Sequence, residues 1–434
     1  MPKVDTRPLI EGLDSEQREL AEALLAHADE ESVPLYACGG PVRDLLLGRP
    51  IRDVDVLVEP GHAVGFEKLL AALEGKGIAC TRHGRFGTVV LRLGRASLDI
   101  ATARSETYAR PGALPTIEPA TLQEDLHRRD FRVNALAVPL CGDGDPRRAS
   151  VLGVEGAFSD LREGRLQVLH DRSFHDDPTR ALRAARLSAR LGFRLSSGTR
   201  VALTNAARDG AFGSVSGDRF RREIEKLFAD SRVGLDPASA LRLLRDWHVL
   251  GVLEPGLELP RNAITPIRRL GRSSQAPPWD LLRHRLWVPG LALWLADLPA
   301  PLRRRVVARF SVSGATATQI LEFRRLRDRL SSRLAAARGR GRVDGELAGL
   351  SEEQLLALHA AAPTAVRRKI VRWAREDRQR RTGLTGNDLR SMGLEGPSIG
   401  RVLARVRVAY LDGAVASRED ALTLARELAR RARR

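Results

Sequence analysis

Residues 39–58 read GGPVRDLLLGRPIRDVDVLV, and this stretch decides the fold class that the sequence predicts. Its two glycines follow a short apolar strand expected at residues 35–38. A short helix is expected at residues 42–47, before a glycine and a proline stop it. A second strand, which carries acids, is expected at residues 54–58. This succession of strand, Gly-Gly turn, helix and acidic strand indicates a mixed α and β unit rather than an all-helical chain.

The acidic stretch is expected to present two carboxylates on one face. Because side chains alternate along a strand, Asp53 and Asp55 share one face, while the valines at 54, 56 and 58 share the other and pack in the core. Like charges this close repel unless a cation lies between them, and carboxylate oxygens suit Mg²⁺. The pair therefore predicts a Mg²⁺ site, although solvated loops often carry the same spacing of acids.

A third acid favours the metal site over a solvated loop. In the segment SLDIATA, Asp99 lies between two apolar residues and projects away from them. Its strand, expected at residues 97–103, forms a hairpin with residues 88–93. We expect antiparallel pairing to bring Asp99 beside the other two acids. Two metal ions in such a site can activate an attacking hydroxyl and neutralise a leaving pyrophosphate.

The Gly-Gly turn offers an anion site next to these acids. Backbone N–H groups at Gly39 and Gly40 can approach a triphosphate closely because no Cβ intervenes, and a helix start favours anions. Arg43 falls in the first helical turn, where it can reach a phosphate. A lone Gly-Gly pair is more often a structural turn, but the acidic strand that follows at once favours the anion site.

The rest of the chain changes character after about residue 140. Before that point, helices expected at residues 15–31 and 65–73 and a strand expected at residues 131–138 complete a mixed α and β head. Beyond it, strand signals thin out and helical periodicity takes over. We expect an α+β fold in four parts: a head (1–140), an all-α neck (141–232), a helical body (233–335) and a basic helical tail (336–434).

The formal net charge of +18 is concentrated at one end of the chain. Residues 1–300 contain 42 Lys and Arg against 40 Asp and Glu, whereas residues 301–434 contain 30 against 14. A nearly neutral N-terminal part and a basic C-terminal part indicate that chemistry and the binding of a polyanion are divided along the chain. A merely solvated basic surface would give the same counts, so charge favours nucleic acid without establishing it.

The cysteines and the apolar segments bear on the compartment. The three cysteines are widely spaced and form no C-x-x-C pair, which predicts neither a disulfide framework nor a zinc site. The N-terminal segment has no apolar core of signal-peptide length, and the most apolar stretch, residues 286–298, is too short to span a bilayer. We therefore expect a cytoplasmic protein with no membrane segment.

Five segments, in order, resemble the motifs of one family. GGPVRDLLLG with DVDVLV resembles the first motif of class II tRNA nucleotidyltransferases and bacterial poly(A) polymerases, which belong to the polymerase β-like superfamily. LDIATARSETYARPGALP is similar to the third acidic strand and its flexible loop, and EDLHRRDFRVNALAV resembles the second motif. FHDDPTRALRAARLSARLGF resembles the base-selecting motif, and GDRFRREIEKLF resembles its supporting helix. The match over residues 35–230 implies a nucleotidyltransferase head with a mixed sheet, followed by a helical neck, body and tail.

The resemblance implies a role for each matching residue. Asp53 and Asp55 would hold the metal ions, and Asp99 would be the third catalytic carboxylate. The other matching residues would bind the nucleotide: its triphosphate by Gly39, Gly40 and Arg43, a phosphate by Arg128 and Arg129, the ribose region by Asp130 and Asn134, the base edge by Asp177 and Arg180, and the nucleotide face by Arg183 and Arg186.

The base-selecting segment also makes chemical sense by itself. Asp177, Arg180, Arg183 and Arg186 recur every three residues, so on a helix they would form a slowly turning stripe. A carboxylate offers only acceptors and a guanidinium only donors, so such a pair can complement the edge of cytosine or adenine without a template. The alternative interpretation of Arg183 and Arg186 is that they form ion pairs on a solvated helix surface. Two departures from the family pattern are Asp176, where Glu is common, and Arg132, where Thr is common.

The implied reaction is attack of a tRNA 3′-hydroxyl on the α-phosphate of CTP or ATP, with Mg²⁺ as cofactor. The basic body and tail would hold the acceptor end of the tRNA through its phosphates, with Arg401, Arg405 and Arg407 as candidate contacts. The loop at residues 106–115 argues against CC-only addition, but CCA addition and A addition both stay open. A poly(A) polymerase and a non-catalytic RNA-binding protein remain alternatives. No obligate protein partner and no phosphohydrolase cluster are indicated.

Overall fold

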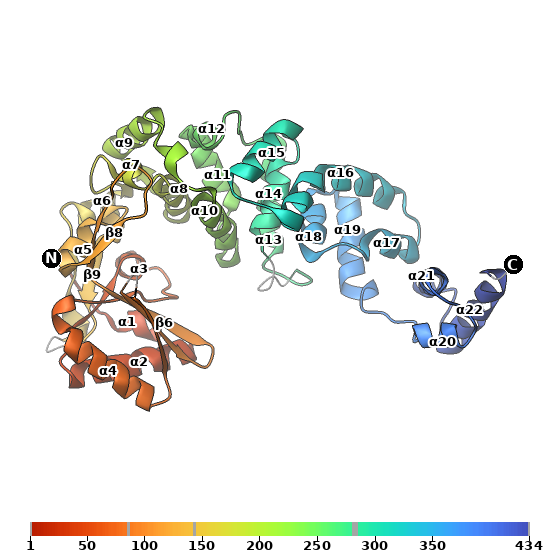
Figure 1. Cartoon of the computed structure of the whole chain (residues 1–434), viewed down its shortest axis with the longest axis horizontal. Helices are drawn as coiled ribbons and strands as arrows, with labels where there is room; N and C mark the ends of the chain where they lie inside the picture. Colours follow the sequence, from red (N-terminus) through yellow and green to blue (C-terminus); the bar gives the residue numbers. More distant parts are fainter. Residues whose placement is uncertain (1, 85–86, 142–144, 280–284, 433–434) are drawn as a thin grey trace. The chain divides into compact units, whose positions relative to one another are not determined.

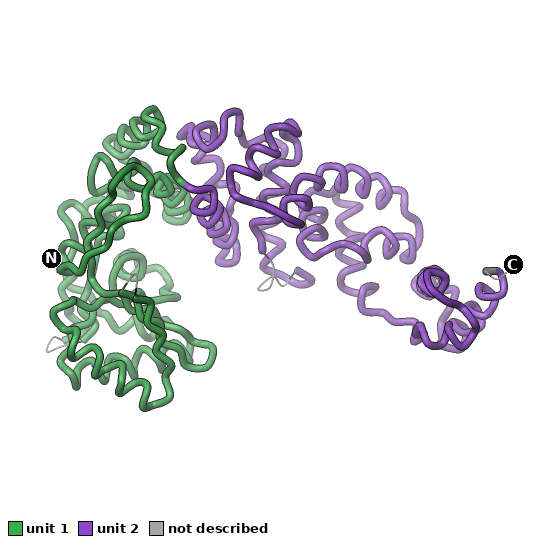
Figure 2. Tube along the Cα trace, in the orientation of Figure 1, with its two compact units in different colours: residues 1–215 green, residues 216–434 purple. Residues whose placement is uncertain are grey.

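The computed structural model describes residues 2–84, 87–141, 145–279 and 285–432. The chain divides into two compact units, Met1–Val215 and Ser216–Arg434 (Figure 2). The first unit holds a mixed sheet with helices, and the second is helical throughout its described part (Figure 1). This arrangement confirms the α+β class. The finer division into head, neck, body and tail stays a prediction.

A seven-stranded sheet forms the core of the first unit. Its strand order is β11-β9-β2-β3-β6-β5-β4, and every neighbouring pair is antiparallel except β3 with β6, which is parallel. The strands are β2 (Leu35–Cys38), β3 (Val56–Val58), β4 (Ala79–His83), β5 (Thr88–Leu93), β6 (Ala96–Thr102), β9 (Leu136–Pro139) and β11 (Leu152–Gly153).

Two amphipathic helices pack against β4, β5 and β6 (Figure 1). Helix α2 (Ser15–Glu30) begins where the side chain of Asp14 accepts a hydrogen bond from the backbone of Gln17, as an N-cap does. It buries leucines at helical spacing, and it lies beside α4 (Ala63–Gly75). The expected helices at residues 15–31 and 65–73 are therefore confirmed.

Smaller elements surround this core. The other helices of the first unit are α1 (Arg7–Glu11), α3 (Gly40–Leu46), α5 (Leu122–His127), α6 (Ala157–Glu163), α7 (Ser173–Asp176), α8 (Arg180–Leu191) and α9 (Ser197–Arg208). A separate hairpin pairs β7 (Arg104–Thr107) with β8 (Thr116–Pro119). Two further short pairs join β1 (Lys3–Val4) to β10 (Ala149–Ser150) and β12 (Arg165–Leu166) to β13 (Arg194–Leu195).

Three local expectations were wrong. Strand β3 begins at Val56, so Asp53 and Asp55 precede the strand instead of lying within it. The pairing of β3 with β6 is parallel, because α4 and the β4–β5 hairpin intervene and return the chain in the same direction. Residues 131–138 are not one strand: a 3₁₀ turn at Arg132–Asn134 comes before β9.

The second unit buries its apolar helix rather than exposing it. Helix α14 (Trp287–Leu295) is buried along nearly its whole length against neighbouring helices. No helix of the described residues has the length and apolar character needed to cross a membrane. The helices are α10 (Gly217–Ala229), α11 (Pro237–Asp246), α12 (Val249–Leu253), α13 (Arg261–Ser273), α14, α15 (Ala300–Arg309), α16 (Gly314–Ala336), α17 (Arg340–Leu347), α18 (Glu352–Ala361), α19 (Thr364–Arg372), α20 (Gly386–Arg390), α21 (Pro397–Leu411) and α22 (Arg418–Ala432).

The last three helices form a small core of their own, with Leu389, Val406 and Ala425 at its centre. Arg407 on α21 donates to both carboxylate oxygens of Asp344 on α17, at 2.7 Å each. The guanidinium of this tail arginine is therefore engaged in holding α21 against α17. Contact of the tail arginines with RNA phosphates stays a prediction.

Candidate active site

A pocket of about 380 Å³ in the first unit brings together most of the residues that the sequence singles out. Four predicted residues are missing from its lining: Arg43, Asp53, Asp99 and Arg186. The predicted residues that line it are Gly39, Gly40, Asp55, Arg128, Arg129, Asp130, Asn134, Asp177, Arg180 and Arg183. Three residues that were not predicted also line it: Arg104, Glu106 and Tyr108.

Asp55 directly precedes β3, and Asp99 lies on β6, the neighbouring strand of the sheet. Val56 is in register with Ile100 in the parallel pair, so Asp55 and Asp99 precede equivalent positions on neighbouring strands. All three acid side chains, Asp53 included, are exposed. The pKa of Asp55 is raised, first because neighbouring protein atoms partly desolvate its carboxyl group, and then because Asp53 and Asp99 are negative.

These acids fit a metal ion that is completed by substrate. Among the described residues, no group of three or more His, Cys, Asp or Glu is close enough to hold a metal ion by itself. Mg²⁺ is commonly bound by one or two carboxylates together with substrate phosphates, and does not need a cage made only of protein. The donor set of Asp53 and Asp55, whose charges repel each other, is of that kind.

The Gly-Gly turn is fixed by its backbone and by an arginine. Gly39 has a φ of 76°, a conformation that L side chains rarely adopt. A Cβ there would lie 2.7 Å from Nη1 of Arg129, so a larger residue would displace that guanidinium. Glycine at this position therefore lets Arg129 lie directly against the turn.

Arg43 does not face the pocket. Its guanidinium is buried and donates to Oδ1 of Asp44 and, at 2.5 Å, to Oδ1 of Asn134. Burial lowers the pKa of Arg43, although Asp44 opposes this effect. Arg190 donates to the other oxygen of Asp44 at 2.6 Å. In the structure Arg43 supports Asn134 from behind, and a phosphate contact by Arg43 stays a prediction.

Asp125, which was not predicted, anchors the two arginines of the second motif. It is fully buried on α5. Its Oδ1 accepts from Arg128 at 2.6 and 2.9 Å, and its Oδ2 accepts from Arg129 at 2.9 and 3.2 Å. Arg129 also donates to Sγ of Cys38 at 3.1 Å. The spacings of three and four residues from Asp125 to these arginines were a signal for this pairing.

The ribose-site candidates form a second pairing. Oδ1 of Asp130 accepts from the side-chain amide of Asn134 at 2.9 Å, and its Oδ2 accepts from Arg183 at 2.8 and 2.9 Å. Burial by itself would raise the pKa of Asp130, but Arg183 and Asn134 outweigh it and lower this pKa to about 2. Asp130 therefore stays ionised at neutral pH.

Asp177 and Arg180, the residues expected to read the base, lie at the start of a helix. Asp177 lies before α8, so the expected stripe does not share one helix and begins at Arg180. Oδ1 of Asp177 accepts from the backbone and hydroxyl of Thr179. Arg180 is buried and donates to Ser173 and to the backbone carbonyl of Arg128. Arg186 is half-buried on the same helix.

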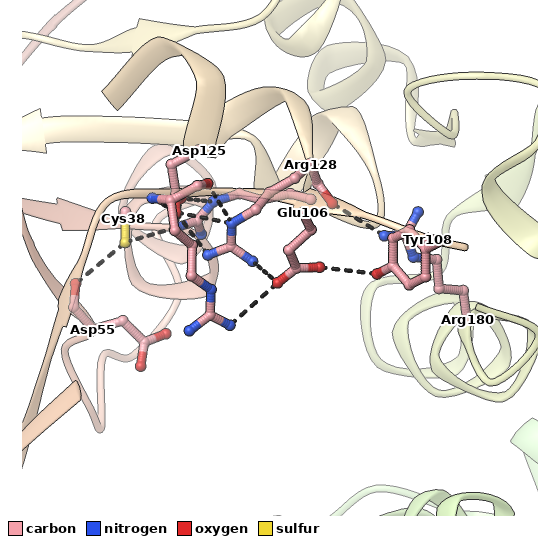
Figure 3. A network of polar contacts seen from close by, with 9 residues as sticks. Cys38, Asp55, Glu106, Tyr108, Asp125, Arg128 and Arg180 are labelled. Atoms are coloured by element: carbon pink, nitrogen blue, oxygen red, sulfur yellow. Dashed lines mark hydrogen bonds and ion pairs between the residues drawn. The ribbon is translucent and has the colours of Figure 1, made fainter. Parts of the chain in front are cut away.

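Arg104, Glu106 and Tyr108 reach the pocket from the β7–β8 hairpin. Figure 3 shows Glu106 between Arg128 and Tyr108, with Cys38 and Asp55 on the side away from Tyr108, and Asp55 lines the pocket. Asp55, which directly precedes β3, thus lines one pocket together with a group of arginines and an acid–arginine pair. This arrangement on a mixed sheet defines a nucleotidyltransferase head of the polymerase β-like fold.

Comparison with known proteins gives the same class. Residues 35–167 match the poly(A) polymerase head domain family. The A-adding tRNA nucleotidyltransferase of Geobacter sulfurreducens is 34% identical over 92% of this chain and 46% of its own length. The A-adding enzyme of Halalkalibacterium halodurans is 29% identical over 96% of this chain and 93% of its own length. The chain thus spans about half the length of the first of these relatives.

Solved structures agree over nearly the whole chain. The apo form of a CCA-adding enzyme covers 98% of this chain and 98% of its own, with a TM-score of 0.74 and 27% identity. The Thermotoga maritima CCA-adding enzyme complexed with tRNA has a TM-score of 0.69 and 27% identity, and covers 97% of this chain and 98% of its own. The chain resembles class II tRNA nucleotidyltransferases over nearly its whole length, and its residues 35–167 match the poly(A) polymerase head domain, a kind of domain that uses a divalent metal ion.

Proposed function

We propose that this chain adds CCA, or its terminal A, to the 3′ end of tRNA without a nucleic-acid template. The observation that carries the proposal is one pocket that joins an exposed acid, anchored arginines and the Asp177–Arg180 pair. The exposed acid suits a metal ion bound to a triphosphate, the arginines suit the negative charge of that triphosphate, and the Asp177–Arg180 pair suits the edge of a base. CTP and ATP would be the nucleotides, and the acceptor end of tRNA would be the second substrate.

In this reaction the tRNA 3′-hydroxyl loses its proton to solvent and its oxygen bonds to the α-phosphorus. The bond from that phosphorus to the bridging oxygen breaks, and pyrophosphate leaves. Mg²⁺, held by Asp53 and Asp55 with Asp99 nearby, would supply charge neutralisation and a more acidic 3′-hydroxyl. Arg128 and Arg129 would hold the triphosphate, and Asp125 limits their movement, which favours a fixed geometry for in-line attack. Positioning and electrostatics would account for most of the rate enhancement.

The nucleotide would be selected by protein groups alone. Asp130 and Asn134 would contact the ribose, with Arg183 and Arg186 on the nucleotide face. Asp177 would accept hydrogen bonds from an exocyclic amino group and Arg180 would donate to a ring nitrogen or carbonyl. Adenine and cytosine both offer an amino group beside an acceptor, whereas guanine and uracil present a different order.

RNA would be held by the second unit through its phosphates. A groove of about 750 Å³ there is lined by Arg221, Arg222, Lys226, Arg232 and Arg285, with Glu225 as the acid among them. Such a surface binds a phosphate backbone with little dependence on sequence. Because its substrates belong to translation, we place the protein in the cytoplasm.

The relatives bear on which nucleotide is added. Two relatives aligned over 92% and 96% of this chain are named A-adding, and solved structures aligned over 97% and 98% of it are CCA-adding enzymes. A CC-adding enzyme of Deinococcus radiodurans, 38% identical, aligns over only 54% of it. These names disfavour addition of CC alone and leave addition of CCA and addition of the terminal A both open.

The test uses purified protein, Mg²⁺ and three tRNA transcripts that end before CCA, after C and after CC, each with CTP, ATP or both. Extension of all three to CCA supports the complete activity, and one A added only to the CC-ended tRNA supports A addition. Long A tails would replace the proposal with poly(A) polymerase. No incorporation by a folded sample would overturn it.

A further inference from the structure

Tyr108 and Glu106 form a tethered pair at the edge of the nucleotide pocket. The hydroxyl of Tyr108 donates to Oε2 of Glu106 at 2.9 Å. Oε1 of the same carboxylate accepts from Arg128 at 2.8 Å and from Arg104 at 3.2 Å. Both oxygens of Glu106 are thus engaged, and its side chain is only 9% exposed. The phenol is held from the side of the arginines (Figure 3).

The ring lies next to the base-reading pair. The charges of Arg180 and Asp177 both act on the phenol of Tyr108, and in Figure 3 the ring lies beside the Arg180 side chain. Burial and then the negative charge of Glu106 raise the pKa of Tyr108 well above its usual value, so the hydroxyl stays a proton donor. Among the described residues that line the pocket, Tyr108 is the one aromatic side chain.

The hairpin that carries Tyr108 is docked at two points. Glu106 attaches one end to Arg128, and the backbone N–H of Gly112 in the connecting turn donates to the carbonyl of His175 on α7 at 3.0 Å. Gly112 has a φ of 68°, and a Cβ there would lie 2.3 Å from Oγ of Ser214, so the turn fits closely. Tyr108 lies between these two points, which limits the space open to its ring.

We propose that the ring of Tyr108 forms one wall of the site for the incoming base and that Glu106 is the residue that positions it. Bases stack on aromatic side chains because every base has a π-face. Asp177 and Arg180 would form hydrogen bonds with the edge of the base, while stacking on Tyr108 would fix the orientation of the base plane. A base stacked on the ring would then present its edge to Asp177 and Arg180. This inference rests on the proposed function, because it assigns a contact within the same pocket.

The test measures ATP affinity directly, so that it does not depend on transfer to RNA. Equilibrium titration with Mg·ATP would compare the wild type with Tyr108→Phe, Tyr108→Leu and Glu106→Gln. Tyr36→Phe is the matched control, because Tyr36 is a partly buried tyrosine of the same unit that does not line the pocket. We expect the Kd for ATP to rise about 3- to 10-fold in Tyr108→Phe, where only the tether is lost. We expect a rise of at least about 10-fold in Tyr108→Leu, where the ring is lost, and none in Tyr36→Phe.

Two further readouts separate positioning from mere folding. With saturating ATP and CC-ended tRNA, kcat in both Tyr108 variants should stay within about 3-fold of wild type, so that the loss appears in KM. If Glu106 acts on the base through Tyr108, the double variant Glu106→Gln/Tyr108→Phe should bind ATP no more weakly than Glu106→Gln. A multiplicative loss in the double variant would overturn the positioning role.

An unchanged Kd in Tyr108→Leu, or a loss confined to kcat and thermal stability, would overturn the base-wall role. If the wild type binds ATP but transfers none to tRNA, the proposed function fails, whereas the Kd values still decide the role of Tyr108. A wild type without measurable ATP affinity would overturn both.

Discussion

One oxygen of Asp130 accepts two hydrogen bonds from the guanidinium of Arg183, at 2.9 and 2.8 Å. The two residues are 53 positions apart and come from the second motif and the base-selecting helix. Asp130 is buried, whereas the Arg183 side chain is 44% exposed at the pocket. The pair therefore joins two halves of the candidate pocket, the second motif and helix α8.

Replacing Asp130 with Asn should separate these halves. The amide keeps an oxygen for Asn134 but turns an NH₂ group toward Arg183, so we expect at least about a 10-fold rise in the Kd for ATP. Unfolding free energy should fall by about 1 to 2 kcal/mol, less than for a fully buried pair because Arg183 is partly exposed. ATP titration and urea unfolding would measure both. If Asp130→Asn and Arg183→Met have additive effects in the double variant, the two residues are not coupled.

Asp53→Asn and Asp55→Asn should each abolish nucleotide incorporation, by at least about 1,000-fold in kcat, because a metal ligand is lost. Neither change should lower the melting temperature measured in EDTA, since each removes a negative charge from a repelling pair. Glu155→Gln, which removes an exposed acid of the same unit, is the matched control and should leave activity intact. Substantial activity in Asp55→Asn, or a clearly lower melting temperature in EDTA, would contradict this assignment.

The basic groove of the second unit should affect the affinity for RNA but not the affinity for ATP. Arg222→Ala removes an exposed charge from its lining, so KM for tRNA should rise about 3- to 10-fold, and the log–log salt dependence of binding should weaken by about one unit. KM for ATP should not change. Arg304→Ala, an exposed arginine of α15 outside the groove, is the control. Equal effects of the two variants on tRNA would show that only overall charge matters.

His359 should make the second unit sensitive to mild acid. Burial, then Arg367 and Arg269, lower the pKa of His359 from 6.5 to about 4, and its ring lies 5.3 Å from that of Trp279. As the pH falls, His359 therefore takes up a proton at a higher pH in the unfolded chain than in the folded one. The stability that the neutral ring contributes is fully present above pH 6.5 and is lost as the pH falls toward 4. The loss should approach about 3 kcal/mol at most.

Chemical unfolding at pH 7.5 and pH 5 would measure this effect. In His359→Phe, which keeps a planar ring, the pH-dependent loss should be smaller than in wild type. The exposed His83→Gln should leave it unchanged. The same loss in His359→Phe as in wild type would assign the sensitivity to other groups.

Much of the head could be predicted because its signals are local. Helix α2 follows from the Asp14 cap and leucines at helical spacing, and β5 and β6 follow from alternating residues around a turn. The parallel pairing of β3 with β6 could not be predicted in this way. It depends on α4 carrying the chain across the sheet, which no residue of either strand encodes.

In the candidate site, too, contacts between residues far apart in the sequence could not be predicted. The ordered motifs predicted most residues of the pocket, and the structure brings those residues together. The burial of Arg43 was missed because one of its partners, Asn134, is 91 positions away. Glu106 and Tyr108 lacked a periodic signal because they come from a strand end and a turn. Their importance follows only from the side chains that they meet.

The most direct test of the central claim supplies a CC-ended tRNA, ATP and Mg²⁺ to the wild type and to Asp55→Asn, and counts both added AMP and released pyrophosphate. We predict that the wild type adds one A to each 3′ end and releases one pyrophosphate for each A, while Asp55→Asn does neither. Absence of AMP addition by folded wild type, or equal addition by Asp55→Asn, would contradict the account.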